Sequence, residues 1–61
     1  MTEPIARFEN GSRIAEVHWL ENSQDYIVRL HNDLGHDFKA YFHKDDLDKA
    51  KSYARGWVDQ A

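Results

Sequence analysis

Three stretches of the chain alternate apolar and polar side chains with a period of two residues, and only short turn sequences separate them. They are "RIAEVHWL", "DYIVRLHN" and "HDFKAYFH", at residues 13–20, 25–32 and 36–43. Successive side chains of a strand point to opposite faces of a sheet, so this alternation predicts three half-buried β-strands. The connecting sequences "ENSQ" and "NDLGH" are short enough for hairpins, and Gly35 suits a left-handed turn position. We therefore expect an antiparallel meander.

A fourth strand is expected upstream of these three. The Asn10-Gly11 dipeptide is a strong signal for a tight hairpin, and it predicts a short edge strand near residues 6–9. Residues 1–4 are expected to form a loose leader. The strand at residues 25–32 is then the central one of the main three.

After Phe42 the apolar period changes from two residues to the helical one. The apolar positions that recur at this spacing are Leu47, Ala50, Ala54, Trp57 and Val58. We expect an amphipathic helix near residues 45–59, with Asp45 as its N-cap and Gly56 weakening its last turns. The predicted fold class is α+β, with a three- or four-stranded antiparallel meander sheet packed on one C-terminal α-helix.

The hydrophobic alternation also limits the strand register, because one face of each strand must meet like-facing neighbours, and we take the tightest of the few hairpin registers that this allows. On the face that accepts the helix, the expected pairs are Trp19–Tyr26, Val17–Val28, Ala15–Leu30, Leu30–Phe38, Val28–Ala40 and Tyr26–Phe42. On the opposite, open face, the expected rows are Ile14–His31–Asp37, Glu16–Arg29–Lys39, His18–Ile27–Tyr41 and Leu20–Asp25–His43. This mixed apolar and charged face is typical of a weak protein contact, but also of an ordinary solvated sheet.

The same register predicts an acidic surface at one end of the sheet, where the "ENSQ" loop and the helix start come together. Its expected members, our first candidate for a partner-binding site, are Glu21, Asp25, Asp45, Asp46 and Asp48. Asp33 and Asp37 belong to the other end. For Asp45 alone, a plain capping role is the simpler interpretation.

Composition limits the function classes. The 61 residues include no cysteine, which excludes disulfides and thiolate zinc sites, and the formal net charge is −3 without a cluster of basic residues. No apolar stretch approaches the length of about 20 residues that a membrane span needs. We expect one small domain, soluble, unprocessed and cytoplasmic, without membrane contact and without a cofactor.

Metal binding and catalysis are both disfavoured. His18, His31 and His43 fall on different strands and rows, too far apart for one tetrahedral ion, and His43 is expected to pair with Asp25 at the surface. His36 is expected to be a turn residue. Serines occur only in turns or on the outer helix face, and the carboxylates stand at a helix start rather than on the two sides of a cleft, as an acid–base pair would. We predict no metal site and no enzymatic activity.

Two alternatives use the open sheet face. A small nucleic-acid-binding module would present Arg29, Lys39 and Tyr41 there with Glu16 in the same row, although so few cations release few counterions. A self-associating subunit would instead cover this face with a copy of itself.

The chain resembles small phage and prophage anti-defence proteins, including anti-CRISPR inhibitors, in its size, acidity, lack of cysteine and layout. The segments that carry the resemblance are "FENGSRIAEVHW", "DYIVRLHNDLGHDFKAYFH" and the closing helix. The resemblance implies a non-enzymatic inhibitor or adaptor in the host cell cytoplasm that binds a basic protein surface, such as that of a CRISPR effector subunit. Acidic side chains could act there as a DNA mimic that masks the nucleic-acid-binding surface.

Overall fold

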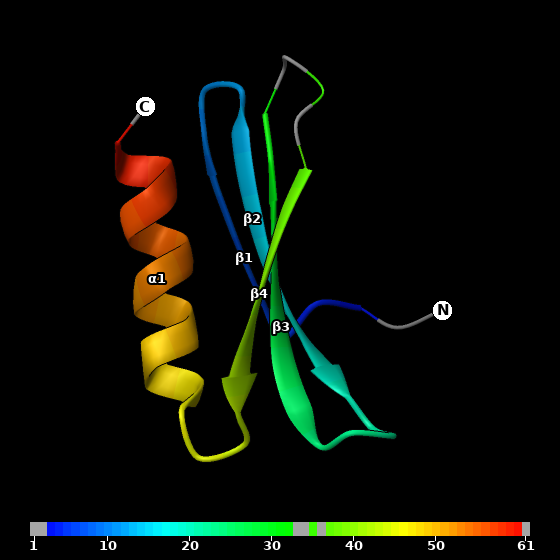
Figure 1. Cartoon of the computed structure of the whole chain (residues 1–61). Coiled ribbons are helices and arrows are strands. Elements are labelled where there is room, and N and C mark those ends of the chain that lie inside the picture. The colour runs from blue at the N-terminus through cyan, green and yellow to red at the C-terminus, as the bar shows by residue number, and fades with distance from the viewer. Residues whose placement is uncertain (1–2, 33–34, 36, 61) are drawn as a thin grey trace.

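The computed structural model describes residues 3–32, 35 and 37–60, which form one four-stranded antiparallel sheet and a C-terminal helix (Figure 1). The elements in chain order are β1 (Ala6–Asn10), β2 (Arg13–Leu20), β3 (Asp25–His31), β4 (Asp37–His43) and α1 (Leu47–Asp59). Neighbours in sequence are neighbours in the sheet, in the order β1-β2-β3-β4. The predicted α+β meander is confirmed in its four-stranded form. The interpretations that concerned Met1, Thr2, Asp33 and His36 lie outside the described residues.

The register of both long hairpins is the predicted one. Val17 lies opposite Val28, and Val28 lies opposite Ala40, so the apolar residues of three strands share one face. β1 continues this face, because Ala6 lies opposite Val17 and Phe8 lies opposite Ala15. A shift by one residue would turn all of these side chains to the other face, so alternation fixes the parity of the pairing, and the tight turns select the register among the few that remain.

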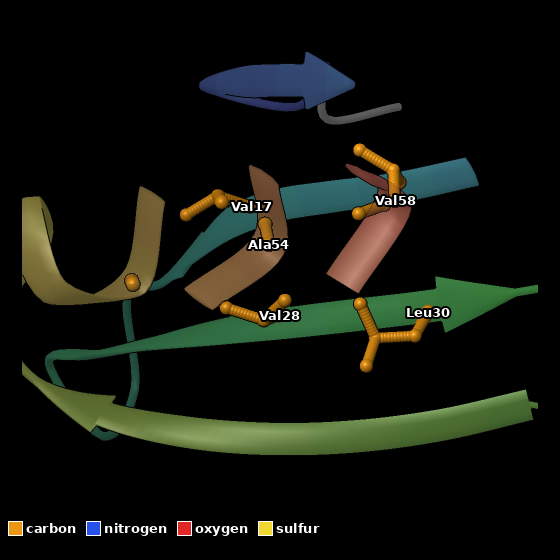
Figure 2. Packing of buried hydrophobic residues seen from close by; sticks show 7 residues of the cluster. Val17, Val28, Leu30, Ala54 and Val58 are labelled. Atoms are coloured by element: carbon orange, nitrogen blue, oxygen red, sulfur yellow. The ribbon is translucent and has the colours of Figure 1, made fainter. Parts of the chain in front are cut away.

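The core lies between this face and α1 (Figure 2). The largest fully buried side chains are Leu30, Val17 and Val28. The helix contributes Ala50 and Ala54, both with no exposed surface, and these small side chains let α1 lie close to the strands. Aromatic residues close the margin, with the Trp19 and Tyr26 rings 4.9 Å apart and the Phe42 and Tyr53 rings 5.6 Å apart.

The turn between β1 and β2 differs from the one that Asn10-Gly11 predicts. Asn10 is still part of β1 and lies opposite Arg13, so Gly11 and Ser12 are the central turn residues. Of these two, Gly11 alone has a positive φ, 61°, as expected for a type II′ turn rather than a type I′ turn. The Asn10 side chain is therefore free to reach the helix.

The helix begins later than predicted, and the assignment of Asp45 as its N-cap was wrong. Asp46 occupies the N-cap position but makes no capping hydrogen bond with its side chain. The cause is a tight turn after β4, in which the Asp46 N–H donates to the His43 carbonyl (2.9 Å) and the Asp45 N–H donates to His43 Nδ1 (3.2 Å). This turn leaves Asp45 outside the helix.

The other end of α1 is held by the first hairpin. Asn10 Nδ2 donates to the Val58 carbonyl at 2.9 Å, and Arg13 Nη1 donates to the Trp57 carbonyl at 2.8 Å. The last carbonyls of a helix lack partners within it, and they carry its negative dipole end. Because the last turn of α1 contains no basic residue, Arg13 supplies the cation from β2. The helix therefore has a fixed direction across the sheet.

Within the described part of the chain, α1 is the one helix, and it is neither long nor apolar enough to cross a membrane.

Candidate functional site

The β2–β3 loop and the segment from β4 to α1 lie at the same end of the sheet (Figure 1). The register explains this, because Asp25 pairs with Leu20 across one hairpin and with His43 at the end of β4. We call the surface formed by residues 21–25 and 44–49 the acidic end. It includes all five predicted acidic residues: Glu21, Asp25, Asp45, Asp46 and Asp48.

Formal charge is unevenly distributed over the chain. The acidic end combines its five carboxylates with Lys44 and Lys49. The rest of the chain is balanced, with six acidic residues (Glu3, Glu9, Glu16, Asp33, Asp37, Asp59) and six basic ones (Arg7, Arg13, Arg29, Lys39, Lys51, Arg55). The formal net charge of −3 is thus carried by this end alone.

Three of these five carboxylates have partners inside the protein. Glu21 Oε2 accepts a hydrogen bond from Trp19 Nε1 at 2.8 Å, and Asp46 lies 4.0 Å from Lys49. Asp45, although largely exposed, lies 3.5 Å from His43 Nδ1. Asp25, at the start of β3, and Asp48, in the first turn of α1, form no ion pair with another described residue. No neighbouring cation in the described part of the chain offsets either charge, and Asp48 is exposed while Asp25 is half-buried.

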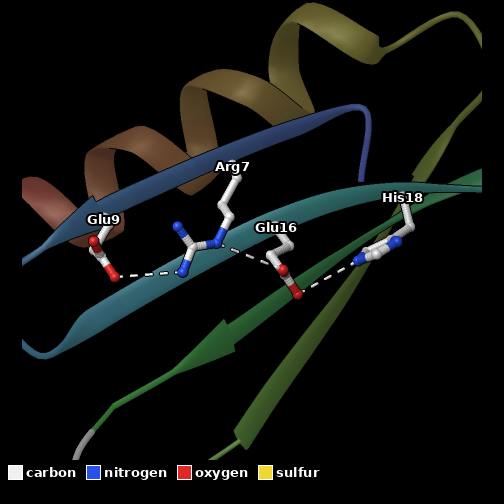
Figure 3. A network of polar contacts seen from close by, with 4 residues as sticks. All are labelled: Arg7, Glu9, Glu16 and His18. Carbon is white, nitrogen blue, oxygen red and sulfur yellow. Dashed lines mark hydrogen bonds and ion pairs between the residues drawn. The ribbon is translucent and has the colours of Figure 1, made fainter. Parts of the chain in front are cut away.

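The open face of the sheet carries a chain of polar contacts between β1 and β2 (Figure 3). Arg7 lies 3.3 Å from Glu9 and 3.8 Å from Glu16, and Glu16 lies 3.5 Å from His18 Nε2. The predicted row Glu16–Arg29–Lys39 is present in the register. However, Glu16 directs its charge toward Arg7 and His18 rather than toward Arg29.

This choice of partner leaves two cations side by side. Arg29 lies opposite Lys39, both are exposed, and neither forms an ion pair with another described residue. Tyr41, two positions along β4 on the same face, is 64% exposed. These three residues are the basic part of the alternative sheet-face site, and Glu16 belongs to it only through the register.

The open face is less apolar than the sequence indicates. Ile27 is only 8% exposed, because it lies on a central strand between His18 and Tyr41 in its row. The exposed apolar surface lies nearer the margins, at Tyr41 on β4 and at Ile5, just before β1. Alternation alone cannot show this, since it assigns a face but not the extent to which neighbours cover a side chain.

Each histidine of the described strands approaches a carboxylate. His18 Nε2 lies 3.5 Å from Glu16, His31 Nδ1 lies 2.6 Å from Asp37, and His43 Nδ1 lies 3.5 Å from Asp45. The predicted pair of His43 with Asp25 is present as register neighbours, but the carboxylate nearest to the His43 ring is that of Asp45, because the turn after β4 brings it back. Among the described residues, no three metal-ligating side chains gather into one site.

No protein-family model, curated protein or solved structure matches this chain.

Proposed function

We propose that this protein is a small non-enzymatic inhibitor or adaptor whose acidic end binds a basic surface of a partner protein. The observation that carries the proposal is the concentration of the whole formal net charge at one end of an otherwise balanced molecule. Such a charge distribution orients a protein during encounter with an oppositely charged surface and increases the association rate.

The arrangement of the carboxylates supports a particular kind of partner. They come from two neighbouring segments, residues 21–25 and 44–49, rather than from one row, so they can contact a groove that normally holds phosphates. In this proposal the protein is a DNA mimic that blocks the nucleic-acid-binding surface of a host defence complex in the cytoplasm, such as a CRISPR effector. The resemblance to anti-CRISPR inhibitors in size, charge and layout favours the same partner.

The test is competition for DNA. Guide-loaded CRISPR effector complexes would be titrated with this protein, and binding of labelled target duplex would be measured by mobility shift. We expect inhibition that weakens as salt increases, because exposed charges are screened within about 8 Å at physiological ionic strength. If every effector in a panel still bound its DNA in the presence of this protein, the choice of a CRISPR effector as partner would be contradicted. Purification of the tagged protein with its bound partners would then identify another partner.

Matched variants then test the acidic end itself. Asp25→Asn with Asp48→Asn removes two charges, one from each segment of the acidic end and neither in an ion pair with another described residue. Glu9→Gln with Asp59→Asn removes the same charge from the opposite end of the molecule. With each lost contact contributing about 0.5–1 kcal/mol, the first pair should weaken binding about tenfold and the second less than about threefold. Equal losses, or none, would overturn the acidic-end model; circular dichroism checks that both variants fold.

A second candidate function rests on the two adjacent cations of the open face. Because Glu16 is paired with Arg7 and His18, Arg29 and Lys39 can contact phosphates beside the exposed Tyr41. This nucleic-acid-binding function predicts a mobility shift of a labelled duplex at low ionic strength that Arg29→Gln with Lys39→Gln abolishes. The absence of any shift would dismiss it.

A further inference from the structure

Exposed aromatic side chains gather along one edge of the sheet. Of the described residues, the large apolar side chains that are exposed are Ile5, Phe38, Tyr41 and Tyr53. Phe38 and Tyr41 belong to β4, and Tyr53 of α1 packs on Phe42 of β4. β4 therefore carries aromatic residues on both of its faces, and Ile5 alone lies elsewhere.

The edge formed by β4 is open. β4 is the last strand of the sheet and pairs only with β3 within the described structure, while α1 passes over β2 and β3 (Figure 2). The other edge strand, β1, is shorter and is joined at its end to α1 through Asn10. A seven-residue edge with outward-pointing backbone amides and carbonyls is a template for another strand.

The sequence of β4 is complementary to itself when it is read in the opposite direction. The strand is Asp37-Phe38-Lys39-Ala40-Tyr41-Phe42-His43, with Ala40 at its centre. Antiparallel pairing of two copies around Ala40 sets Asp37 against His43, Phe38 against Phe42, and Lys39 against Tyr41. Each is a favourable cross-strand pair: a carboxylate with an imidazole, two aromatic rings, and a cation with a ring.

We propose that two copies of this chain pair through their β4 strands, with a two-fold axis at Ala40, to form a continuous eight-stranded sheet. The axis is perpendicular to the sheet, so both helices lie on the same face. Phe38 of one copy then fills the space beside Phe42 and Tyr53 of the other. In an edge strand every second residue points its amide and carbonyl away from the sheet. Residues equally distant from Ala40 are either both of this outward-pointing kind or both of the other kind. The outward-pointing amides of one copy therefore meet the outward-pointing carbonyls of the other.

Other registers of the same two strands are less favourable. An axis at Lys39 would place the two Lys39 ammonium groups opposite each other, and like charges in direct opposition are destabilising. An axis at Tyr41 would place Lys39 against His43 and leave Asp37 without an opposite residue in β4. A lysine on an edge strand normally discourages pairing. Around Ala40 it is instead accommodated by the partner's Tyr41, which favours a second copy over an arbitrary strand.

The first test is the mass of the protein in solution. A contact of one strand on each side is small for a protein interface, so we expect dimers at concentrations on the order of 100 µM and monomers well below that. Phe38→Ser should raise the dissociation constant at least tenfold, because it removes two aromatic pairs per dimer. Ile5→Ser is the matched control, since Ile5 is 46% exposed against 51% for Phe38, and it should leave the dimer unchanged.

A chain that stays monomeric up to about 1 mM would overturn the proposal, because even weak specific contacts bind in this range. Equal loss of the dimer in both variants would also overturn it, since Ile5 lies on the margin of the open face. In that case the open face, and not the β4 edge, would hold the copies together.

The second test uses the absence of cysteine from the chain. Ala40→Cys introduces a unique thiol at the proposed axis, where it would face its own copy across two paired strands, and Ser12→Cys places one in the exposed β1–β2 turn. Under mild oxidation the Ala40→Cys variant should form a disulfide-linked dimer at least tenfold faster than the Ser12→Cys variant. Equal rates would mean random collision and would overturn the Ala40 register. Neither test depends on the function of the acidic end.

Discussion

Arg13 joins the first hairpin to the end of the helix through two contacts. Its guanidinium donates to the Trp57 carbonyl at 2.8 Å and lies 4.8 Å from the centre of the Trp57 ring. A cation at a helix C-terminus contributes roughly 0.3–1 kcal/mol, and a cation over an aromatic ring about 0.5–1 kcal/mol. Both contacts use one planar group, so a single substitution removes them together.

We therefore predict that Arg13→Ala lowers the free energy of unfolding by about 1–2 kcal/mol in urea denaturation. The free energy of unfolding of Arg13→Lys should lie between those of the unchanged protein and Arg13→Ala, because an ammonium group keeps the charge but cannot stack and donate in the same planar geometry. The matched control is Arg55→Ala, which removes an exposed pair with Asp59 at 4.0 Å and should change stability by less than about 0.5 kcal/mol. Similar losses at both positions would show that the contacts of Arg13 are not stabilising.

At the scale of single residues, the sequence did not predict which side chains form ion pairs and hydrogen bonds with each other. The register correctly placed Glu16 opposite Arg29 and Asp25 opposite His43, yet Glu16 pairs with Arg7 and His18 instead. A charged side chain has several neighbours within reach on a sheet, and the choice depends on rotamers that no periodicity encodes. The contact between Arg13 and Trp57 further required knowing the direction of α1 across the sheet.

At the scale of elements, α1 contains one position that weakens it without any packing reason. Gly56 lies within the last turns of the helix, is exposed, and would meet nothing within 4 Å if it carried a Cβ atom. Glycine in a helix interior costs about 1 kcal/mol relative to alanine, chiefly through the entropy of the unfolded chain. The helix continues through Gly56 to Asp59 because the first hairpin binds its last carbonyls.

Gly56→Ala should therefore stabilise the protein by about 0.5–1 kcal/mol, which corresponds to an increase in Tm of roughly 4–8 °C per kcal/mol for a domain of this size. Thermal unfolding followed by circular dichroism measures the change. Gly35→Ala is the opposing control. A Cβ atom at Gly35 would also meet nothing within 4 Å, but φ there is 80°, a backbone conformation that disfavours alanine, so Tm should fall. A decrease for Gly56→Ala would mean that the glycine has a role that its surroundings do not show.

Elements were the most predictable level of this protein. Strict alternation in three segments determined which residues of β2, β3 and β4 share a face, and short loops left few possible registers. Element ends were harder, because they depend on single hydrogen bonds. The helix starts after Asp46 since the His43 carbonyl and ring bind the two amides before it. Asn10, expected in the turn, extends β1 instead and reaches Val58.

For the molecule as a whole, the size of the core limits how much change the chain tolerates. A domain of about 60 residues buries only about 60% of the surface that its unfolded chain exposes. Here the fully buried large side chains are Leu30, Val17 and Val28, and the helix adds mainly alanines. This small core is compatible with many surface sequences, so charge could gather at the acidic end and aromatic residues at β4 without loss of the fold.

Leu30→Ala tests this view of the core. Leu30 is 1% exposed in the cluster between the sheet and α1, and truncation of such a leucine costs about 2–5 kcal/mol. At roughly 0.05–0.15 kcal/mol per residue, the total stability of the 61-residue chain is about 3–9 kcal/mol, so we expect Leu30→Ala to lose about half of its free energy of unfolding or more, as measured by urea denaturation followed by circular dichroism. Phe38→Ala is the control, because Phe38 lies opposite Leu30 but is 51% exposed, and its truncation should cost about 1 kcal/mol.

Both variants are measured at low protein concentration, where pairing through β4 does not contribute. Cooperative unfolding of Leu30→Ala with a loss below about 1 kcal/mol would show that the core does not depend on this residue.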